Sequence, residues 1–272
     1  MRWAAFAGVA VAVTLLLLLL ARASQGAVGT PPATPGEVRW LDRLDDGADH
    51  LDAGDAPEPA PASPLEASMA SSSSMSPVVL LVNVAFSQGL FGLLLLAGAW
   101  YTGIPASAFG AGSGDVGLDA LAVGVGFGIA LSLANGVAGA AASALGRDPS
   151  EDLRALLAPD SAGGWVLLLG VVLPLIAGFE ELLFRGALVG VMATGFGWSP
   201  WLLALASSAA FALGHGAQGP VGIVVTGLLG FVLAAGYVIT GSLLVVVVAH
   251  YLVNAVEFVA YEGLDLEPPF GG

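Results

Sequence analysis

The sequence contains no cysteine and no lysine, and few of its residues carry a charge. Without cysteine, the chain can form no disulfide, no thiolate zinc site and no cysteine nucleophile. All seven basic residues are arginine, and they stand against 21 acidic residues for a net charge of −14. This balance excludes a basic nucleic-acid-binding surface. An acidic excess without lysine also suggests a halophilic source, because high salt screens the self-repulsion of such a chain.

Long hydrophobic runs dominate the chain, since 57% of residues are hydrophobic, 10% are charged and mean hydropathy is +0.88. These values are typical of multi-spanning membrane proteins. About 20 apolar residues cross the hydrocarbon core of a bilayer. We therefore predict an all-α, polytopic transmembrane helix bundle, integral to the cell membrane and in contact with its lipid. Six core spans are expected, with a hydrophobic helix before them at residues 3–21. The core spans are 78–100, 117–145, 164–193, 199–214, 220–239 and 241–262.

Composition divides the chain into four parts. Residues 1–22 are either a membrane anchor or a signal peptide cleaved near Ala23, and the length of the apolar run favours the anchor. Residues 23–76 are predicted to be a disordered acidic linker, because nine acidic residues and many Pro, Ala and Ser cannot form an apolar core. Residues 77–263 are predicted to form an intramembrane domain, and residues 264–272 a C-terminal tail.

A few polar residues stand alone in or near the apolar runs. Asn83, Gln88 and Asn135 each interrupt a span, and a hydrogen bond between helices is the expected role of each. Glu257 lies near the end of the last span and is assigned to the membrane interface. A short amphipathic helix is expected between residues 146 and 162, where its leucine face would dock on the membrane surface. The alternative is that this helix lines the approach to the site.

Two adjacent carboxylates and an arginine interrupt the span at 164–193, in the order Glu180, Glu181 and Arg185. A single charge at the centre of a lone membrane helix costs about 2.5–3.5 kcal/mol, so such groups persist where they face a polar cavity. Glu181 and Arg185 lie one helical turn apart, in the order that favours an ion pair. Glu180 projects about 100° away and stays free to act as a general base or acid. The alternative is a structural ion-pair network between helices.

The hydrophobic region contains two histidines, each in a polar motif. His215 follows an apolar helix one turn after Phe211, where it could cap the helix end or act on a substrate. Phe211 is assigned to the core, packed beside His215. His250 and Asn254 lie one turn apart on one helix face, and together they could stabilise a developing oxyanion. The alternative for this pair is a hydrogen bond between helices.

The three motifs, in this order along the chain, resemble the CPBP family, also called the Abi family. It comprises CAAX prenyl proteases and bacteriocin-processing enzymes. The resemblance covers roughly residues 160–258. It implies an all-helical intramembrane endopeptidase that acts on a membrane-associated peptide or lipidated protein, such as a prenylated CAAX-type substrate. The motifs are Glu180-Glu181-x-x-x-Arg185, Phe211-x-x-x-His215 and His250-x-x-x-Asn254.

The resemblance also implies a role for each matching residue. Glu180 would activate the attacking water, with help from His215. His250 and Asn254 would stabilise the tetrahedral oxyanion. The Glu181–Arg185 pair would support the geometry of the site.

The resemblance leaves the need for a metal open, because family members have been described both as metalloproteases and as metal-free, glutamate-dependent enzymes. Glu180, His215 and His250 could supply three zinc ligands and leave a position for water. Glu180 would then no longer be available as the base, and the His-Glu-x-x-His motif of many zinc proteases is absent. The metal-free version is therefore slightly favoured.

Two other functions share some of these features. A catalytically silent scaffold or immunity protein that sequesters peptides would keep the fold, but it should have lost at least one motif residue. A proton-coupled transporter would also place Glu, Arg and His inside a bundle. It would more often show an internal repeat, which the sequence lacks. The intact motif set therefore favours the protease over both alternatives.

Overall fold

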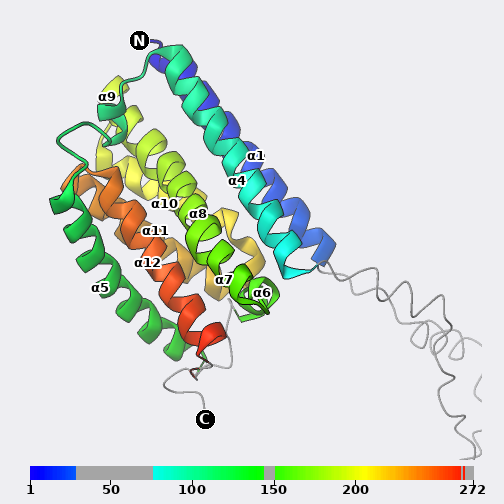
Figure 1. Ribbon diagram of the computed structural model, residues 1–272. Coiled ribbons are helices and arrows are strands. Elements are labelled where there is room, and N and C mark those ends of the chain that lie inside the picture. The colour runs from blue at the N-terminus through cyan, green and yellow to red at the C-terminus, as the bar shows by residue number, and fades with distance from the viewer. Residues whose placement is uncertain (29–75, 144–150, 265, 267–272) are drawn as a thin grey trace, which may run out of the picture.

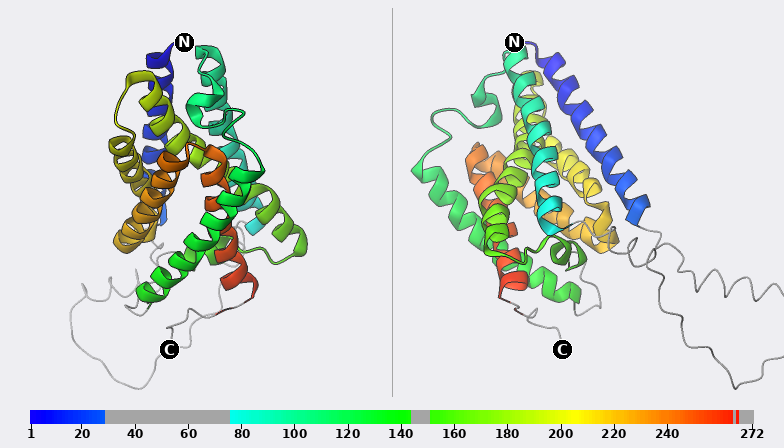
Figure 2. Two further views of the ribbon diagram at one scale, coloured as in Figure 1. Left: turned by 90° about the vertical axis from the view of Figure 1, so that its left-hand side faces the viewer. Right: turned by 45° about the vertical axis from the view of Figure 1, so that its right-hand side comes forward.

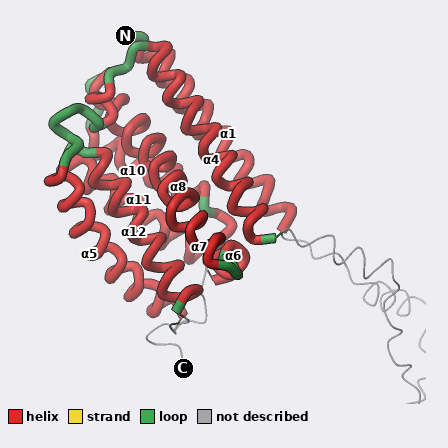
Figure 3. Tube along the Cα trace, viewed as in Figure 1, coloured by secondary structure: helices red, strands yellow, loops and turns green. Residues whose placement is uncertain are grey.

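The computed structural model describes residues 1–28, 76–143, 151–264 and 266. Within these ranges every regular element is helical, which confirms the predicted all-α bundle (Figure 1, Figure 3). Most of the predicted acidic linker and of the C-terminal tail lies outside the described residues. The α-helices are α1 (Trp3–Val28), α4 (Pro77–Thr102), α5 (Leu118–Ser143), α6 (Glu151–Leu157), α7 (Ala162–Leu167), α8 (Leu173–Glu181), α9 (Met192–Phe196), α10 (Pro200–Gly214), α11 (Gly219–Thr240) and α12 (Leu243–Phe258). Tighter 3₁₀ turns lie at Ala106–Phe109 and Gly216–Gln218, and wider π-helical segments at Leu168–Val172, Leu182–Val191 and Val259–Gly263.

Six helical segments in the described part of the chain are long and apolar enough to cross a membrane, and α1 is one of them. The protein is therefore a multi-pass integral membrane protein. The predicted span at 199–214 is helical, but α10 has 15 residues and is shorter than a full crossing. It stops there because Gly214 and Gly216 flank His215 at the turn, and Pro220 then begins α11. The short length of α10 leaves His215 at a helix end next to α11.

The segment from Ala162 to Phe196 is one long helical span with two π-helical segments in it. The first ends just before Pro174, whose ring nitrogen cannot donate the backbone hydrogen bond of a regular helix. The second begins directly after Glu181. Wide turns of this kind inside α-helices are frequent at functional sites. Here the irregularity coincides with the predicted Glu180–Arg185 motif.

The N-terminal helix α1 packs into the bundle and runs antiparallel beside α4 (Figure 1, Figure 2). Its Phe6, Ala10 and Val13 side chains are buried. The ring of Phe6 meets the ring of Phe109 edge to face, with 5.4 Å between centroids. Phe6 belongs to the same apolar core as Phe179 beside the predicted motif. The membrane anchor and the signal peptide both stay predictions for residues 1–22.

Helix α5 lies closely against α12, and glycines make the approach possible (Figure 2). A Cβ atom at Gly128 would come within 2.9 Å of the Leu252 side chain and 3.0 Å of the Ala249 backbone. A Cβ at Gly124 would meet the Val245 carbonyl oxygen at 2.9 Å. Small residues serve this purpose in many membrane bundles. The contact fixes the position of α12, the helix that carries His250 and Asn254.

Candidate functional site

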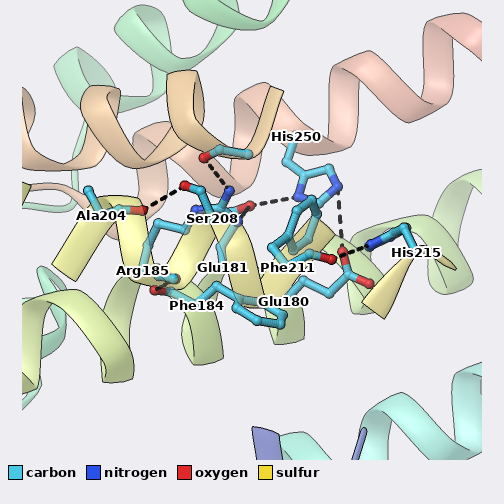
Figure 4. Close-up of polar contacts among 11 residues, drawn as sticks. Glu180, Glu181, Phe184, Arg185, Ala204, Ser208, Phe211, His215 and His250 are labelled. Carbon is cyan, nitrogen blue, oxygen red and sulfur yellow. Dashed lines mark hydrogen bonds and ion pairs between the residues drawn. The ribbon is translucent and has the colours of Figure 1, made fainter. Parts of the chain in front are cut away.

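A cavity of about 360 Å³ lies inside the bundle, bordered by residues of α4, α5, α8, α10, α11 and α12. Glu180, His215, His250 and Asn254 all line this cavity, although they come from three different parts of the bundle. Figure 4 shows Glu180, His215 and His250 gathered around Phe211. The four residues predicted to be catalytic therefore meet at one place.

The second carboxylate of the motif is buried behind the cavity in an ion pair. Nη1 of Arg185 donates to Oε1 of Glu181 at 2.7 Å, and both side chains are fully buried. Nη2 of Arg185 donates to the Gly230 carbonyl oxygen at 2.7 Å, and the guanidinium lies over the Phe211 ring at 4.8 Å. The predicted Glu181–Arg185 pair is thus present, and it also ties α11 to the motif (Figure 4).

His250 connects the two carboxylates of the motif. Its Nδ1 lies 2.7 Å from Oε1 of Glu181, the same oxygen that accepts from Arg185. Because an ionised carboxylate can only accept, Nδ1 carries the proton in this contact. Its Nε2 lies 3.7 Å from Oε2 of Glu180 (Figure 4). Glu181 therefore orients the ring, and the other ring nitrogen faces Glu180.

The two adjacent carboxylates have different surroundings. Glu181 is committed to Arg185 and His250 and is fully buried, whereas the Glu180 side chain is 13% exposed and lines the cavity. The one-residue step along α8 turns them about 100° apart. The prediction that one carboxylate is paired and the other is left available matches this geometry.

Phe211 positions both histidines. Its ring centroid lies 4.5 Å from that of His215 and 6.1 Å from that of His250. His215 closes the C-terminal end of α10, and its Nδ1 donates to the Phe211 carbonyl oxygen at 2.9 Å when that nitrogen carries the proton. His215 thus ends the helix as expected and also lines the cavity, while its action on a substrate stays a prediction. The assignment of Phe211 to the core is confirmed, and its ring also lies under the guanidinium of Arg185.

Asn254 lines the cavity one turn beyond His250, and its amide makes no hydrogen bond to the described residues. The alternative for His250 and Asn254 was a hydrogen bond between helices. Only His250 makes one, to Glu181 of α8. A carboxamide in this position is available to donate to a ligand in the cavity.

Sequence patterns did not indicate the role of Gly230, whose carbonyl oxygen binds Arg185. A Cβ at this position would lie 2.9 Å from the Phe211 ring and 3.5 Å from Nη2 of Arg185. Ser207 was also missed; its hydroxyl donates to the Phe184 carbonyl oxygen at 2.6 Å and ties α10 to the motif segment. A glycine or serine in an apolar run is common, so neither carried a signal of its own.

The far part of the cavity lining contains an arginine held by acidic residues. Arg154 of α6 donates to Glu257 at 2.8 Å and to Glu262 at 3.4 Å, and Asn135 donates to Glu257 at 3.3 Å. The expected inter-helix bond of Asn135 is confirmed. The predicted helix within 146–162 is present as α6, and Arg154 and Leu157 line the cavity. Membrane docking alone is therefore too simple a description of α6, because Arg154 attaches it to the end of α12.

Glu180, His215 and His250, the three possible zinc ligands, all line the cavity. Among the described residues, no group of three His, Asp or Glu side chains is placed to hold a metal ion. Whether the reaction needs a metal stays open.

Comparison with family models matches residues 162–256 to the family described as Type II CAAX prenyl endopeptidase Rce1-like. No curated protein and no solved structure gave a match. The matched segment runs from α7 into α12 and contains all three motifs, which confirms the resemblance seen in the sequence. Helices α1, α4 and α5 lie outside it. Residues 162–256 of this multi-pass membrane protein therefore match a family of proteases, the Rce1-like type II CAAX prenyl endopeptidases.

Proposed function

We propose that this protein is an intramembrane endopeptidase that hydrolyses a peptide bond with a water molecule activated by Glu180. One observation carries the proposal. Glu180, His215, His250 and Asn254 line a single cavity, while the neighbouring carboxylate of Glu181 is buried and already paired. Two carboxylates with such different surroundings suit two roles, one in chemistry and one in support.

In the proposed first step, the Glu180 carboxylate takes a proton from water while the water oxygen attacks the carbonyl carbon of the scissile bond. His215 assists by orienting the water. Its Nδ1 is engaged with the Phe211 carbonyl oxygen, so the lone pair on Nε2 can accept a hydrogen bond from the same water. The Phe211 ring, 4.5 Å from the imidazole, holds this orientation.

The attack places negative charge on the carbonyl oxygen, which needs hydrogen-bond donors already in position. The amide of Asn254 supplies one donor. Nε2 of His250, 3.7 Å from Glu180, supplies the second when the ring is protonated. Glu180 then delivers its proton to the leaving nitrogen, the C–N bond breaks, and the products are a new carboxyl group and a new amino group.

Glu181 and Arg185 act only through His250 in this scheme and are positioning residues. Oε1 of Glu181 fixes the imidazole through Nδ1 at 2.7 Å, and Arg185 compensates the buried negative charge at the same distance. An orienting carboxylate behind a catalytic imidazole serves the same purpose in other hydrolases.

The proposed substrate is a membrane-associated peptide or lipidated protein. Much of the cavity lining is apolar, with Val84 of α4, Ile176 of α8 and Leu229 of α11 among its residues. Such a surface accommodates apolar side chains or a lipid group. The description of the matched family names CAAX prenyl endopeptidases. A farnesylated peptide ending in a CAAX sequence is therefore the first substrate to test.

The test compares wild-type protein with Glu180→Gln in detergent, using the farnesylated peptide and a pool of membrane-extracted peptides. General-base catalysis contributes about 10²–10⁴-fold, so cleavage by Glu180→Gln should fall at least about 10²-fold while its melting temperature is retained. Asp160→Asn, at an exposed position, is the matched control. In the metal-free scheme, a chelator leaves cleavage unchanged.

Two results would contradict the proposal. Cleavage by Glu180→Gln at the wild-type rate would remove Glu180 from the mechanism. A folded wild-type protein that cleaves neither the farnesylated peptide nor any member of the pool would refute endopeptidase activity itself. Loss of cleavage with chelator, restored by added zinc, would replace the metal-free scheme with a metal-dependent one.

A further inference from the structure

The α4 wall of the cavity carries a polar atom without a partner. Gln88 of α4 lines the cavity together with Glu180 and His250. Its Oε1 is buried and accepts no hydrogen bond from the described residues. The other two atoms of this kind in the described part of the chain are Oε2 of Glu181 and Nε of Arg185, whose groups are already joined in an ion pair. Gln88 is thus the one residue among these three whose side chain takes part in no ion pair.

Gln88 also departs from the expectation that it bonds a neighbouring helix. Asn135 meets that expectation through Glu257, whereas Asn83, the third isolated carboxamide, is exposed on α4. Buried polar groups in proteins almost always have a hydrogen-bond partner. A polar side chain that faces a cavity within a membrane span therefore indicates a functional contact. A hydrogen-bond donor on a molecule in the cavity would satisfy Oε1 of Gln88.

The position of Gln88 relative to Glu180 follows from the packing of α4 on α8. A Cβ at the adjacent Gly89 would lie 3.6 Å from the Leu175 side chain. This part of α4 therefore packs beside Leu175 of α8. Leu175 precedes Glu180 by five residues on the α8 span, which is about 7–8 Å along a helix axis. An extended peptide advances about 3.3 Å per residue. A peptide that ran along α8, with its scissile bond beside Glu180, would therefore pass Gln88 about two residues away.

The chemistry of a peptide substrate supplies the missing donor. An extended peptide brings backbone N–H groups into an apolar cavity, and each one left without an acceptor opposes binding. In the described part of the chain no β-strand edge is present to pair with it. A side-chain carboxamide oxygen is a suitable acceptor for a backbone N–H.

We infer that Gln88 binds the substrate, with its Oε1 accepting a hydrogen bond from a backbone N–H about two residues from the scissile bond. This inference rests on the proposed endopeptidase function and adds a residue outside the matched segment 162–256 to the site. It also assigns the α4 wall to the peptide part of the substrate.

The test measures binding rather than cleavage, in the Glu180→Gln background. The probe is a fluorescent farnesylated CAAX-type peptide, used together with a series in which one backbone amide at a time is replaced by an ester. An ester keeps the chain shape but lacks the N–H. Gln88→Leu should weaken binding of the all-amide peptide about 10-fold, equivalent to about 1.4 kcal/mol. One ester position near the scissile bond should weaken binding to a similar extent when Gln88 is present, and should have no effect in the Gln88→Leu variant. The matched control is Asn83→Leu, an exposed position of the same helix, and it should change neither value.

Measuring the amide and ester peptides on both proteins separates the role of Gln88 from the proposed function. Equal peptide binding with and without the Gln88→Leu substitution, or ester effects of equal size in both proteins, overturns the role of Gln88 even if the wild-type protein cleaves the peptide. A wild-type protein that neither binds nor cleaves refutes the proposed function instead. Gln88→Leu removes an unpartnered polar atom, so the variant should fold; if it does not, Gln88→Met takes its place in the same cycle.

Discussion

Replacing Glu181 should destabilise the protein because it leaves a buried charge without compensation. Arg185 is fully buried, and Glu181 is its carboxylate partner at 2.7 Å. The other contacts of Arg185 are with the Gly230 carbonyl oxygen and the Phe211 ring, and neither neutralises the charge of the guanidinium. Removing one partner of a buried ion pair costs about 3–5 kcal/mol. Glu181→Leu should therefore lower the melting temperature by on the order of 10 °C.

A second substitution should restore stability without restoring activity. Replacing a whole buried ion pair with apolar side chains of similar volume is often neutral or stabilising. Glu181→Leu combined with Arg185→Met should therefore melt close to wild type. His250, however, still lacks the acceptor for its Nδ1. Loss of the carboxylate that orients a catalytic histidine costs about 10⁴-fold in serine proteases. We expect kcat to fall by at least about 10²-fold in both variants.

The assay pairs thermal unfolding in detergent, followed by tryptophan fluorescence, with cleavage of the farnesylated peptide well below each melting temperature. Asp160→Asn, at an exposed carboxylate, again serves as the control. The reasoning is wrong if Glu181→Leu is as stable as wild type, because Arg185 would then not need its partner. It is also wrong if the double variant cleaves at the wild-type rate, because His250 would then not need Glu181.

Two further predictions concern the packing that positions the site. Phe6→Ala should destabilise the protein by about 3–5 kcal/mol, because Phe6 is fully buried in the shared core. Leu16→Ala, at an exposed position of the same helix, should change the melting temperature little. Gly128→Ala should cost about 1–3 kcal/mol and reduce cleavage by moving α12, since its Cβ would lie 3.0 Å from the Ala249 backbone. Gly126→Ala, where a Cβ meets nothing within 4 Å, should be tolerated, and equal behaviour of the two alanine variants would contradict the packing.

Helical spacing made part of the site predictable. A period of 3.6 residues places positions i and i+4 on one face, which is why the Glu181–Arg185 pair and the shared face of His250 and Asn254 could be expected. The contact of Glu181 with His250 joins residues 69 positions apart. No local pattern contains such a contact, because it depends on how α12 is set against α8 by the glycines of α5.

Gln88 and Asn135 show the limit of sequence reasoning most directly. In the sequence they are equivalent, because each is a single carboxamide in an apolar run, and the same inter-helix bond was expected for both. The fold separates them: α5 presents Asn135 to Glu257 of α12, whereas α4 presents Gln88 to the cavity. A buried carboxamide bonded to another helix stabilises the bundle whether or not a substrate is present. A carboxamide oxygen that faces a cavity without a partner becomes fully satisfied only when a donor enters. In a membrane enzyme, the polar residue whose expected structural bond is missing therefore indicates substrate contact more strongly than the one whose bond is found.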